Sequence, residues 1–236
     1  MTLKKLATVS ALTAALVGFG SSAQALPIGL ALVLDESGSI SSANWTLQKT
    51  GYANVLGSGL IKTDGSLVIG VWKFDNTVEQ VFAPTLIDDA GDKAALVAAI
   101  NAMAQGGGTT AIGDGVTAAY NAFLAYANPL SSAFSKVVID VSTDGFSNTG
   151  SNPTTASNAA IAGGVSAVNC LGIGAGASCD WNPAASLDFA ATSFADFERI
   201  LGEKIATETD QIPEPATLVL MGLGLFGLGA SRRRKS

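Results

Sequence analysis

The sequence contains no histidine and only two cysteines among its 236 residues. Without histidine, the chain cannot form a Ser/His/Asp or Cys/His nucleophilic site, a histidine general base or a histidine-ligated zinc or iron. Two cysteines, Cys170 and Cys179, are too few for a four-thiolate zinc site or an iron–sulfur cluster held by this chain alone. Any metal that the chain binds is therefore expected to be held by oxygen atoms.

Basic residues are scarce in the body of the chain. Of the 13 lysines and arginines, six lie within residues 1–25 and 212–236, whereas Glu214 is the only one of the 19 acidic residues found there. The body is therefore strongly acidic, which argues against a nucleic-acid partner and favours cations and solubility outside a cell.

The first 25 residues have the order of a secretory signal peptide. Lys4 and Lys5 precede an apolar run at 6–19, and small residues then end in Ala23-Gln24-Ala25, an A-x-A cleavage site. We predict that the mature chain begins at Leu26. An uncleaved membrane anchor is the alternative, although the apolar run is short for a membrane span.

The C-terminal segment, residues 212–236, also has three parts. Pro213, Glu214 and Pro215 precede an apolar run at 216–230, and a basic cluster ends the chain. This order resembles the PEP-CTERM sorting signal of bacterial surface proteins. The resemblance implies transient anchoring in the inner membrane, processing by an exosortase-type enzyme at the Pro-Glu-Pro motif, and final placement at the cell surface or in the extracellular matrix. The positive-inside rule places the basic end in the cytoplasm, and a plain C-terminal membrane anchor is the alternative.

Residues 26–211 are predicted to form one α/β domain, because apolar runs typical of buried strands alternate with helical patterns. The expected strands are 28–34, 67–72, 78–82, 137–141 and 165–173, and the expected helices are 43–56, 92–103, 112–126, 155–162 and 194–207. This alternation predicts a doubly wound, mainly parallel sheet covered on both faces. The turn at 75–77 is too short for a parallel crossover, so one antiparallel edge strand is expected.

The first expected strand ends in the sequence Asp-Glu-Ser-Gly-Ser at residues 35–39. Because alternate residues of an extended segment share a face, Asp35, Ser37 and Ser39 are expected to project together from the carboxyl end of the strand. In open α/β sheets, ligands bind at that edge. Three oxygen donors are thus predicted where a binding site is expected.

Two later loops supply further oxygen donors at the same edge. The first reads Gly-Gly-Gly-Thr-Thr at 106–110, and the second reads Ser-Thr-Asp-Gly at 142–145. Glycines in the first loop allow the backbone to pass close to a central ion. Together with the D-x-S-x-S sequence, these loops resemble the metal-ion-dependent adhesion site (MIDAS) of von Willebrand factor type A (VWFA) domains, in a bacterial secreted subgroup of unknown function.

The resemblance implies a Rossmann-like VWFA fold for residues 26–211. The ligand set that it implies is Asp35, Ser37, Ser39, Thr110 and Asp144. The three hydroxyls would bind the metal directly and the two aspartates through water, with Thr109 as the alternative to Thr110. Such hard oxygen donors favour Mg²⁺, with Mn²⁺ as an alternative, whereas Ca²⁺ would want more carboxylates. A purely structural reading is that these residues cap helices and turns.

Neutral hydroxyl ligands leave part of the metal charge uncompensated, so the metal can accept a carboxylate from a partner. We therefore expect a surface or matrix adhesion protein, not an enzyme, that uses Mg²⁺ to bind an acidic protein side chain or an anionic extracellular polymer. One alternative is a structural matrix protein whose metal only stabilises loops. A second is a metal-assisted hydrolase that uses Asp140 or Asp144 as its base.

Three acidic residues outside the motif are expected to have other roles. Asp140 lies deeper in an apolar strand and needs a buried partner. Asp114 is expected to serve the start of its helix, and Glu36 is expected to face solvent.

Cys170 and Cys179 flank a glycine-rich turn. In an exported protein this spacing fits one local disulfide, with free thiols as the alternative. Trp181 follows closely and is expected to be covered by its own loop.

Overall fold

A computed structural model of the chain describes residues 25–184 and 186–210. The two predicted terminal segments, the signal peptide at 1–25 and the sorting signal at 212–236, lie outside this part of the chain except for Ala25. Within the part described, no helix combines the length and the hydropathy needed to cross a membrane.

Six strands alternate with helices along the chain. The elements are β1 (Ile28–Asp35), α1 (Ser42–Gly57), β2 (Leu67–Phe74), β3 (Val78–Leu86), α2 (Ala90–Ala102), α3 (Ile112–Tyr126), a short 3₁₀ helix (Leu130–Ser132), β4 (Lys136–Thr143), α4 (Pro153–Ala162), β5 (Ala167–Ile173), β6 (Asp188–Ala191) and α5 (Phe197–Glu208).

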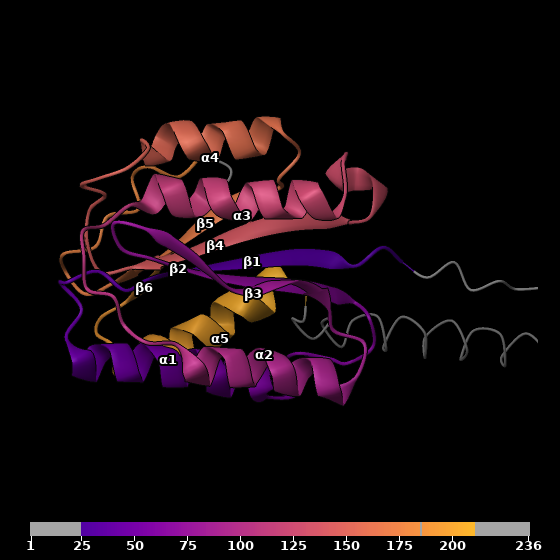
Figure 1. Cartoon of the computed structure of the whole chain (residues 1–236), viewed down its shortest axis with the longest axis horizontal. Helices are drawn as coiled ribbons and strands as arrows, with labels where there is room; N and C mark the ends of the chain where they lie inside the picture. Colours follow the sequence, from indigo (N-terminus) through magenta and orange to yellow (C-terminus); the bar gives the residue numbers. More distant parts are fainter. Residues whose placement is uncertain (1–24, 185, 211–236) are drawn as a thin grey trace, which may run out of the picture.

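The strands form one sheet in the order β3-β2-β1-β4-β5-β6. All neighbouring pairs are parallel except β2 and β3. Helices α3 and α4 cover one face of the sheet, and α1, α2 and α5 cover the other (Figure 1). The predicted doubly wound, mainly parallel sheet with one antiparallel edge strand is confirmed.

Burial on both faces explains the continuous apolar runs of the central strands. In β1, Leu30, Leu32 and Leu34 belong to the core beneath α1, α2 and α5. Ala31 and Val33 belong to the core beneath α3. Since alternate residues point to opposite faces, a central strand covered on both sides has no polar face.

Several element boundaries differ from expectation by one to four residues, and one strand was not expected. Helix α2 begins at Ala90 rather than 92, because the Asp89 carboxylate accepts hydrogen bonds from the amides of Gly91 and Asp92. Helix α5 begins at Phe197 rather than 194. Strand β6 was not predicted, because its four residues neither alternate clearly between apolar and polar side chains nor include a β-branched residue.

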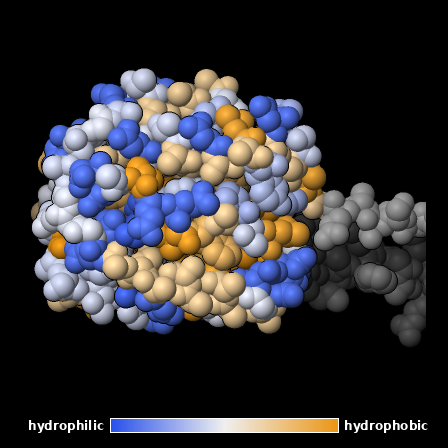
Figure 2. Space-filling model, viewed as in Figure 1, coloured by the Kyte–Doolittle hydropathy of each residue, from blue (hydrophilic) through white to orange (hydrophobic). Residues whose placement is uncertain are grey.

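The antiparallel strand β3 forms one edge of the sheet. Figure 2 shows hydrophobic residues beside hydrophilic ones on the surface between α2 and α3, where Figure 1 places β3. Val81 and Phe82 pack partly on the core, while Glu79 and Gln80 are exposed. Pro84 has no amide hydrogen to offer, and the pairing with β2 is irregular, so this edge is poorly suited to bind another strand.

Cys170 and Cys179 form a disulfide, which confirms the expected bridge. It ties β5 to the loop that follows, and the Trp181 indole donates a hydrogen bond of 2.8 Å to the carbonyl of Ser178 in the same loop. Trp181 is buried, as expected for a side chain covered by its own loop. The Ser178 amide also donates to the carbonyl of Gly145, so this loop lies beside the end of β4.

Candidate metal centre

The candidate site lies where the winding of the sheet reverses. The chain leaves β1 toward β2 on one side, whereas β4 and β5 extend the sheet on the other side of β1. Such a switch point, at the carboxyl ends of the strands, is where open α/β sheets form a crevice for ligands. Asp35 and Thr143 are the last residues of the neighbouring parallel strands β1 and β4.

A chain of hydrogen bonds joins the first loop to the end of β4. The hydroxyls of Ser37 and Ser39 lie 3.0 Å apart, and the Ser39 hydroxyl donates to Asp144 Oδ1 at 2.6 Å. Ser37 and Asp144 are separated by more than 100 residues in sequence, yet Ser39 bridges them. The D-x-S-x-S loop and the aspartate of the third loop are therefore brought together at this edge.

Asp35 lies beneath this pair and is fully buried. Its Oδ1 accepts a hydrogen bond from the Ser37 amide at 2.8 Å, and its Oδ2 accepts one from the Thr143 hydroxyl at 2.6 Å. Burial raises the pKa of Asp35 to about 6, although the hydrogen bonds from Ser37 and Thr143 oppose the shift. A nearby cation would favour the ionised form of this carboxyl.

Neither aspartate of the site has a basic partner among the residues that the structure places. No lysine or arginine of residues 25–184 and 186–210 lies within ion-pair distance of Asp35 or Asp144. The negative charge of Asp144 also contributes to the raised pKa of Asp35. Two neighbouring carboxylates without a basic partner are an arrangement that a bound cation would stabilise.

Thr110 is buried and Thr109 is exposed. The amide of Thr110 donates to Asn148 Oδ1 at 2.9 Å, and its carbonyl accepts from the Asn148 amide at 3.0 Å and from the Ser147 hydroxyl at 3.3 Å. These bonds fix Thr110 against the loop after β4. The hydrogen bonds that link Ser37, Ser39 and Asp144 do not extend to Thr110.

The prediction that Glu36 faces solvent is wrong. Glu36 is 3% exposed and forms an ion pair of 3.1 Å with Lys73, and its Oε2 accepts a hydrogen bond of 2.8 Å from the Gly106 amide. Burial raises the pKa of Glu36, while the Gly106 amide and Lys73 oppose the shift. Glu36 therefore ties the D-x-S-x-S loop to the glycine loop instead of facing water.

The glycine loop is packed tightly against these carboxylates. Asp75 Oδ2 accepts from the Gly108 amide at 3.1 Å, and the Gly38 amide donates to the Gly108 carbonyl at 2.8 Å. A Cβ atom on Gly38 would lie 2.8 Å from the Gly107 carbonyl oxygen, which is too close for any side chain. Gly107 itself has a φ of +94°, a conformation that favours glycine. The glycines thus let two loops of the site meet.

A family model described as "Protein of unknown function (DUF1194)" matches residues 25–212. The chain belongs to the DUF1194 family. A model of the PEP-CTERM protein-sorting motif matches residues 211–235 of the DUF1194 chain, which indicates an exported protein that is sorted through the membrane and processed by an exosortase. A search of the curated proteins found no match.

Solved structures of VWFA domains resemble the DUF1194 chain. Proximal thread matrix protein 1 (PTMP1) of the mussel byssus has a TM-score of 0.65 at 23% identity, over 77% of this chain and 48% of that one. A structure of PTMP1 with a zinc-occupied MIDAS motif has a TM-score of 0.62 at 22% identity, over 77% and 47% of the two chains. A von Willebrand factor type A protein from Catenulispora acidiphila has a TM-score of 0.61 at 18% identity, over 78% and 43%. The chain spans less than half the length of these structures, and at such identities the likeness shows the fold.

Three residues of the DUF1194 chain support the site although no motif singled them out as functional. The Thr143 hydroxyl donates a hydrogen bond to the Asp35 carboxylate. The side-chain amide of Gln48 donates to the backbone carbonyl of Asp35 at 3.0 Å, and the Tyr52 hydroxyl donates to Ser142 Oγ at 3.0 Å. Gln48 and Tyr52 lie one turn apart on α1 and are both fully buried. Polar side chains at inward positions of the first helix were the sequence signal that could have revealed them.

Asp140 has the buried partner that was expected. It forms an ion pair with Lys204 of α5, which also pairs with Glu208 at 2.8 Å, and all three side chains are buried. Burial and the nearby charge of Glu208 raise the pKa of Asp140 to about 7, although Lys204 opposes the shift. Asp114 lies in the first turn of α3 as expected, but its carboxylate accepts a hydrogen bond from the Ser151 amide of the loop before α4.

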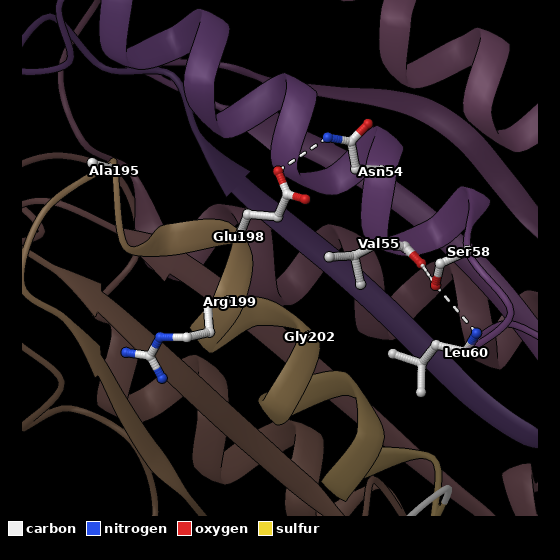
Figure 3. Close-up of a pocket in the computed structure, with 8 residues that line it drawn as sticks. All are labelled: Asn54, Val55, Ser58, Leu60, Ala195, Glu198, Arg199 and Gly202. Carbon is white, nitrogen blue, oxygen red and sulfur yellow. Dashed lines mark hydrogen bonds between the residues drawn. The ribbon is translucent and has the colours of Figure 1, made fainter.

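A separate hollow of about 490 Å³ lies between α1 and α5 (Figure 3). Figure 3 shows Glu198 turned toward Asn54, whose amide donates to it at 3.0 Å. Arg199 pairs with Asp196 at 3.1 Å and with Glu203 at 2.8 Å along α5. The polar groups here pair with one another rather than pointing together into the hollow, so the switch point of the sheet remains the candidate site.

Proposed function

We propose that this protein is an exported binding protein, rather than an enzyme, that holds a divalent cation at the sheet edge and uses it to bind a carboxylate of a partner. The proposed ligands are Asp35, Ser37, Ser39, Thr110 and Asp144. Mg²⁺ is the proposed ion and Mn²⁺ the alternative, because the donors are hydroxyl and carboxylate oxygens without nitrogen or sulfur.

The observation that carries this proposal is the hydrogen-bonded bridge through Ser39. It joins the hydroxyl of Ser37 to the carboxylate of Asp144, at a place where two carboxylates have no basic partner within residues 25–184 and 186–210. The burial of Thr110, in contrast to exposed Thr109, supports Thr110 as the third hydroxyl. A Cβ at Gly38 would overlap the facing loop, which supports a backbone arranged to bring these groups together.

Neutral hydroxyl ligands suit a cation that must bind a partner. If carboxylates filled the coordination shell, the charge of the ion would be neutralised within the protein. With three hydroxyls, part of the charge is left to attract an anionic oxygen from outside. The partner is accordingly an acidic protein side chain or an anionic extracellular polymer.

The comparisons support the same proposal. PTMP1, which shares the fold, is a thread matrix protein with a MIDAS motif that has been seen with zinc. The PEP-CTERM motif supports placement at the cell surface or in the extracellular matrix, after transient anchoring in the inner membrane. Both observations favour a protein that works outside the cell.

Titration calorimetry with Mg²⁺ tests the proposal. The wild-type chain should take up one Mg²⁺, and Ser39→Ala and Asp144→Asn should weaken the uptake at least tenfold. Ser157→Ala is the matched control, because Ser157 is a buried serine of α4 whose hydroxyl has no hydrogen-bond partner among the residues described. Failure of the wild-type chain to take up Mg²⁺ or Mn²⁺ at millimolar concentration would overturn the proposal.

A second measurement separates partner binding from a purely stabilising metal. Acetate should bind to the Mg²⁺-loaded chain and should not bind after chelation. If Mg²⁺ raises the melting temperature but acetate binding is the same with and without chelator, the ion only stabilises the loops and the binding function is wrong.

A further inference from the structure

An exposed aromatic ring and an uncharged polar loop lie next to the candidate metal centre. Phe146, two residues after Asp144, is 64% exposed. Residues 147–153, which are serine, asparagine, threonine, glycine and proline, then line a hollow of about 320 Å³. The metal-site functions assigned above use neither feature.

The polar loop is held in place beside Thr110. Asn148 bonds to Thr110 through both its side-chain oxygen and its amide, and the Ser151 amide donates to Asp114 at 2.9 Å. Asn152 caps α4 by accepting from the Thr155 amide at 3.0 Å. Because the backbone is fixed at both ends of the loop, the exposed side chains of Asn148 and Ser151 have defined positions next to the site.

The charges around the loop restrict the kind of anion that can bind. Residues 137–198, which include both loops on this side of the site, contain no lysine or arginine. Asp144 and Asp180 add negative charge to this stretch, and Asp114 of α3 lies against it through its hydrogen bond with the Ser151 amide. No basic side chain of this stretch can attract an anion, and a ligand with many closely spaced charges, such as a sulfated polymer, would be repelled by its aspartates.

A sugar acid matches these three features together. A uronate carries one carboxylate for each ring, its hydroxyls suit asparagine and serine side chains, and the C–H face of a neighbouring ring suits an exposed aromatic ring. An acidic peptide matches them less well, because its glutamate or aspartate side chains bring neither ring hydroxyls for the uncharged polar hollow nor a C–H ring face for Phe146.

We propose that the partner is a uronic-acid-containing polysaccharide, whose carboxylate binds the metal while an adjacent sugar ring packs on Phe146 and its hydroxyls bind the 147–153 loop. This inference rests on the proposed metal-dependent function and names the class of its ligand.

Calorimetry with defined oligosaccharides tests the inference. The probes are tetramers of galacturonate, mannuronate and guluronate and short hyaluronate oligomers, each with its methyl ester, and tetraglutamate as the peptide arm. At least one oligouronate should bind in Mg²⁺, and the binding should be lost with the ester and after chelation. Phe146→Ala should weaken it about three- to tenfold, the size of one aromatic contact, without changing Mg²⁺ uptake. Leu187→Ala is the matched control, because Leu187 is 45% exposed but precedes β6, away from the carboxyl ends of the strands.

The outcomes separate the two proposals. If Mg²⁺ is taken up but no oligouronate binds, the ligand class is wrong and the metal site stands. If tetraglutamate binds as tightly as the sugars and Phe146→Ala changes neither, the partner is an acidic peptide. If Mg²⁺ is not taken up at all, the proposed function fails, and the inference fails with it.

Discussion

Asp35 shows how the site holds a carboxylate in the core without a basic partner. Two hydrogen bonds, from the Ser37 amide and the Thr143 hydroxyl, replace the water that the carboxylate loses on burial. A cation bound above it would add a stabilising charge. The residue therefore depends on a neighbour that is outside the D-x-S-x-S motif.

Thr143→Val should reveal this dependence. Valine keeps the shape of threonine but leaves Oδ2 of Asp35 without its 2.6 Å hydrogen bond. We expect the free energy of unfolding to fall by about 1 to 3 kcal/mol, measured in denaturant without metal. Thr143→Ser retains the hydroxyl and should lose much less. Equal losses in the two variants would contradict this account, because Thr143→Ser keeps the hydroxyl that bonds to Asp35.

The sequence allowed the hydroxyls of the site to be predicted better than the residues around them. Ser37 and Ser39 were predicted from the period of an extended segment, and the structure places the Ser39 hydroxyl in hydrogen-bond contact with both Ser37 and Asp144. The prediction for Glu36 was wrong because the same period puts its side chain on the face of the loop opposite to Ser37, where solvent was expected. Only the tertiary structure shows that Lys73 and the Gly106 amide bind the carboxylate on that face. Single-strand periodicity cannot reveal which loop will cover a side chain.

The buried group of Asp140, Lys204 and Glu208 predicts a pH effect on stability. Asp140 has a pKa of about 7 in the folded chain, compared with an ordinary value of 3.8, because it is buried and because Glu208 lies nearby. The charge of Lys204 opposes this shift. The Tyr52 hydroxyl also faces the carboxylates of Asp140 and Glu208. The folded chain thus holds a proton that the unfolded chain has lost between about pH 4 and pH 7. The free energy of unfolding should fall across this range as pH rises, by at most about 1.4 kcal/mol per pH unit for one proton.

Asp140→Asn should reduce the slope most clearly between about pH 6 and pH 7, above the pKa of about 6 of Asp35, since it removes the titrating carboxyl and leaves Lys204 paired with Glu208. Glu203→Gln, on the exposed side of the same helix, should keep the slope. Urea unfolding at several pH values provides the measurement. An unchanged slope in Asp140→Asn would assign the pH dependence to another group.

At the scale of elements, the close approach of α3 to the loop before α4 positions residues 147–153 beside the site. A Cβ on Gly113, in the first turn of α3, would overlap the backbone carbonyl of Ser151. The glycine therefore sets how near the 147–153 loop can lie to Thr110. No helical pattern in the sequence distinguishes such a contact glycine from one that only weakens its helix.

Two helical glycine substitutions should consequently have opposite effects. Gly113→Ala should destabilise the fold by about 1 to 3 kcal/mol, because backbone must move to admit the methyl group. Gly202→Ala in α5 places its Cβ 3.9 Å from Val55, an ordinary contact, and should stabilise by up to about 1 kcal/mol. Thermal and denaturant unfolding of both variants check this pair, and destabilisation of both to the same extent would contradict it.

Elements also mark where sequence patterns stop being informative. The central strands were predicted because burial on both faces demands continuous apolar runs. Strand β6 was missed because an edge strand of four residues buries little and needs no such run. Its position follows instead from backbone pairing with β5, which no side-chain pattern records.

At the scale of the whole molecule, the sheet order brings two loops from distant parts of the chain to one edge. The crossing from β1 to β2 in one direction, and the placement of β4 on the other side of β1, make this convergence a property of the topology. The alternation of strands and helices predicts a doubly wound sheet, but the contact between Ser39 and Asp144 requires the order of the strands. Fold class and ligand candidates could thus be inferred from sequence, whereas their supporting bonds could not.

The location of a bound Mn²⁺ ion in crystals of the protein, found by anomalous scattering, is the most direct test of the metal centre. One peak should lie at the carboxyl ends of β1 and β4, within direct ligand distance of the hydroxyls of Ser37, Ser39 and Thr110. The competing place is the acidic cluster of Asp88, Asp89 and Asp92, whose carboxylates lie within 4.8 Å of one another at the start of α2. A peak at that cluster alone, or no peak at the sheet edge at millimolar Mn²⁺, would contradict the proposed site.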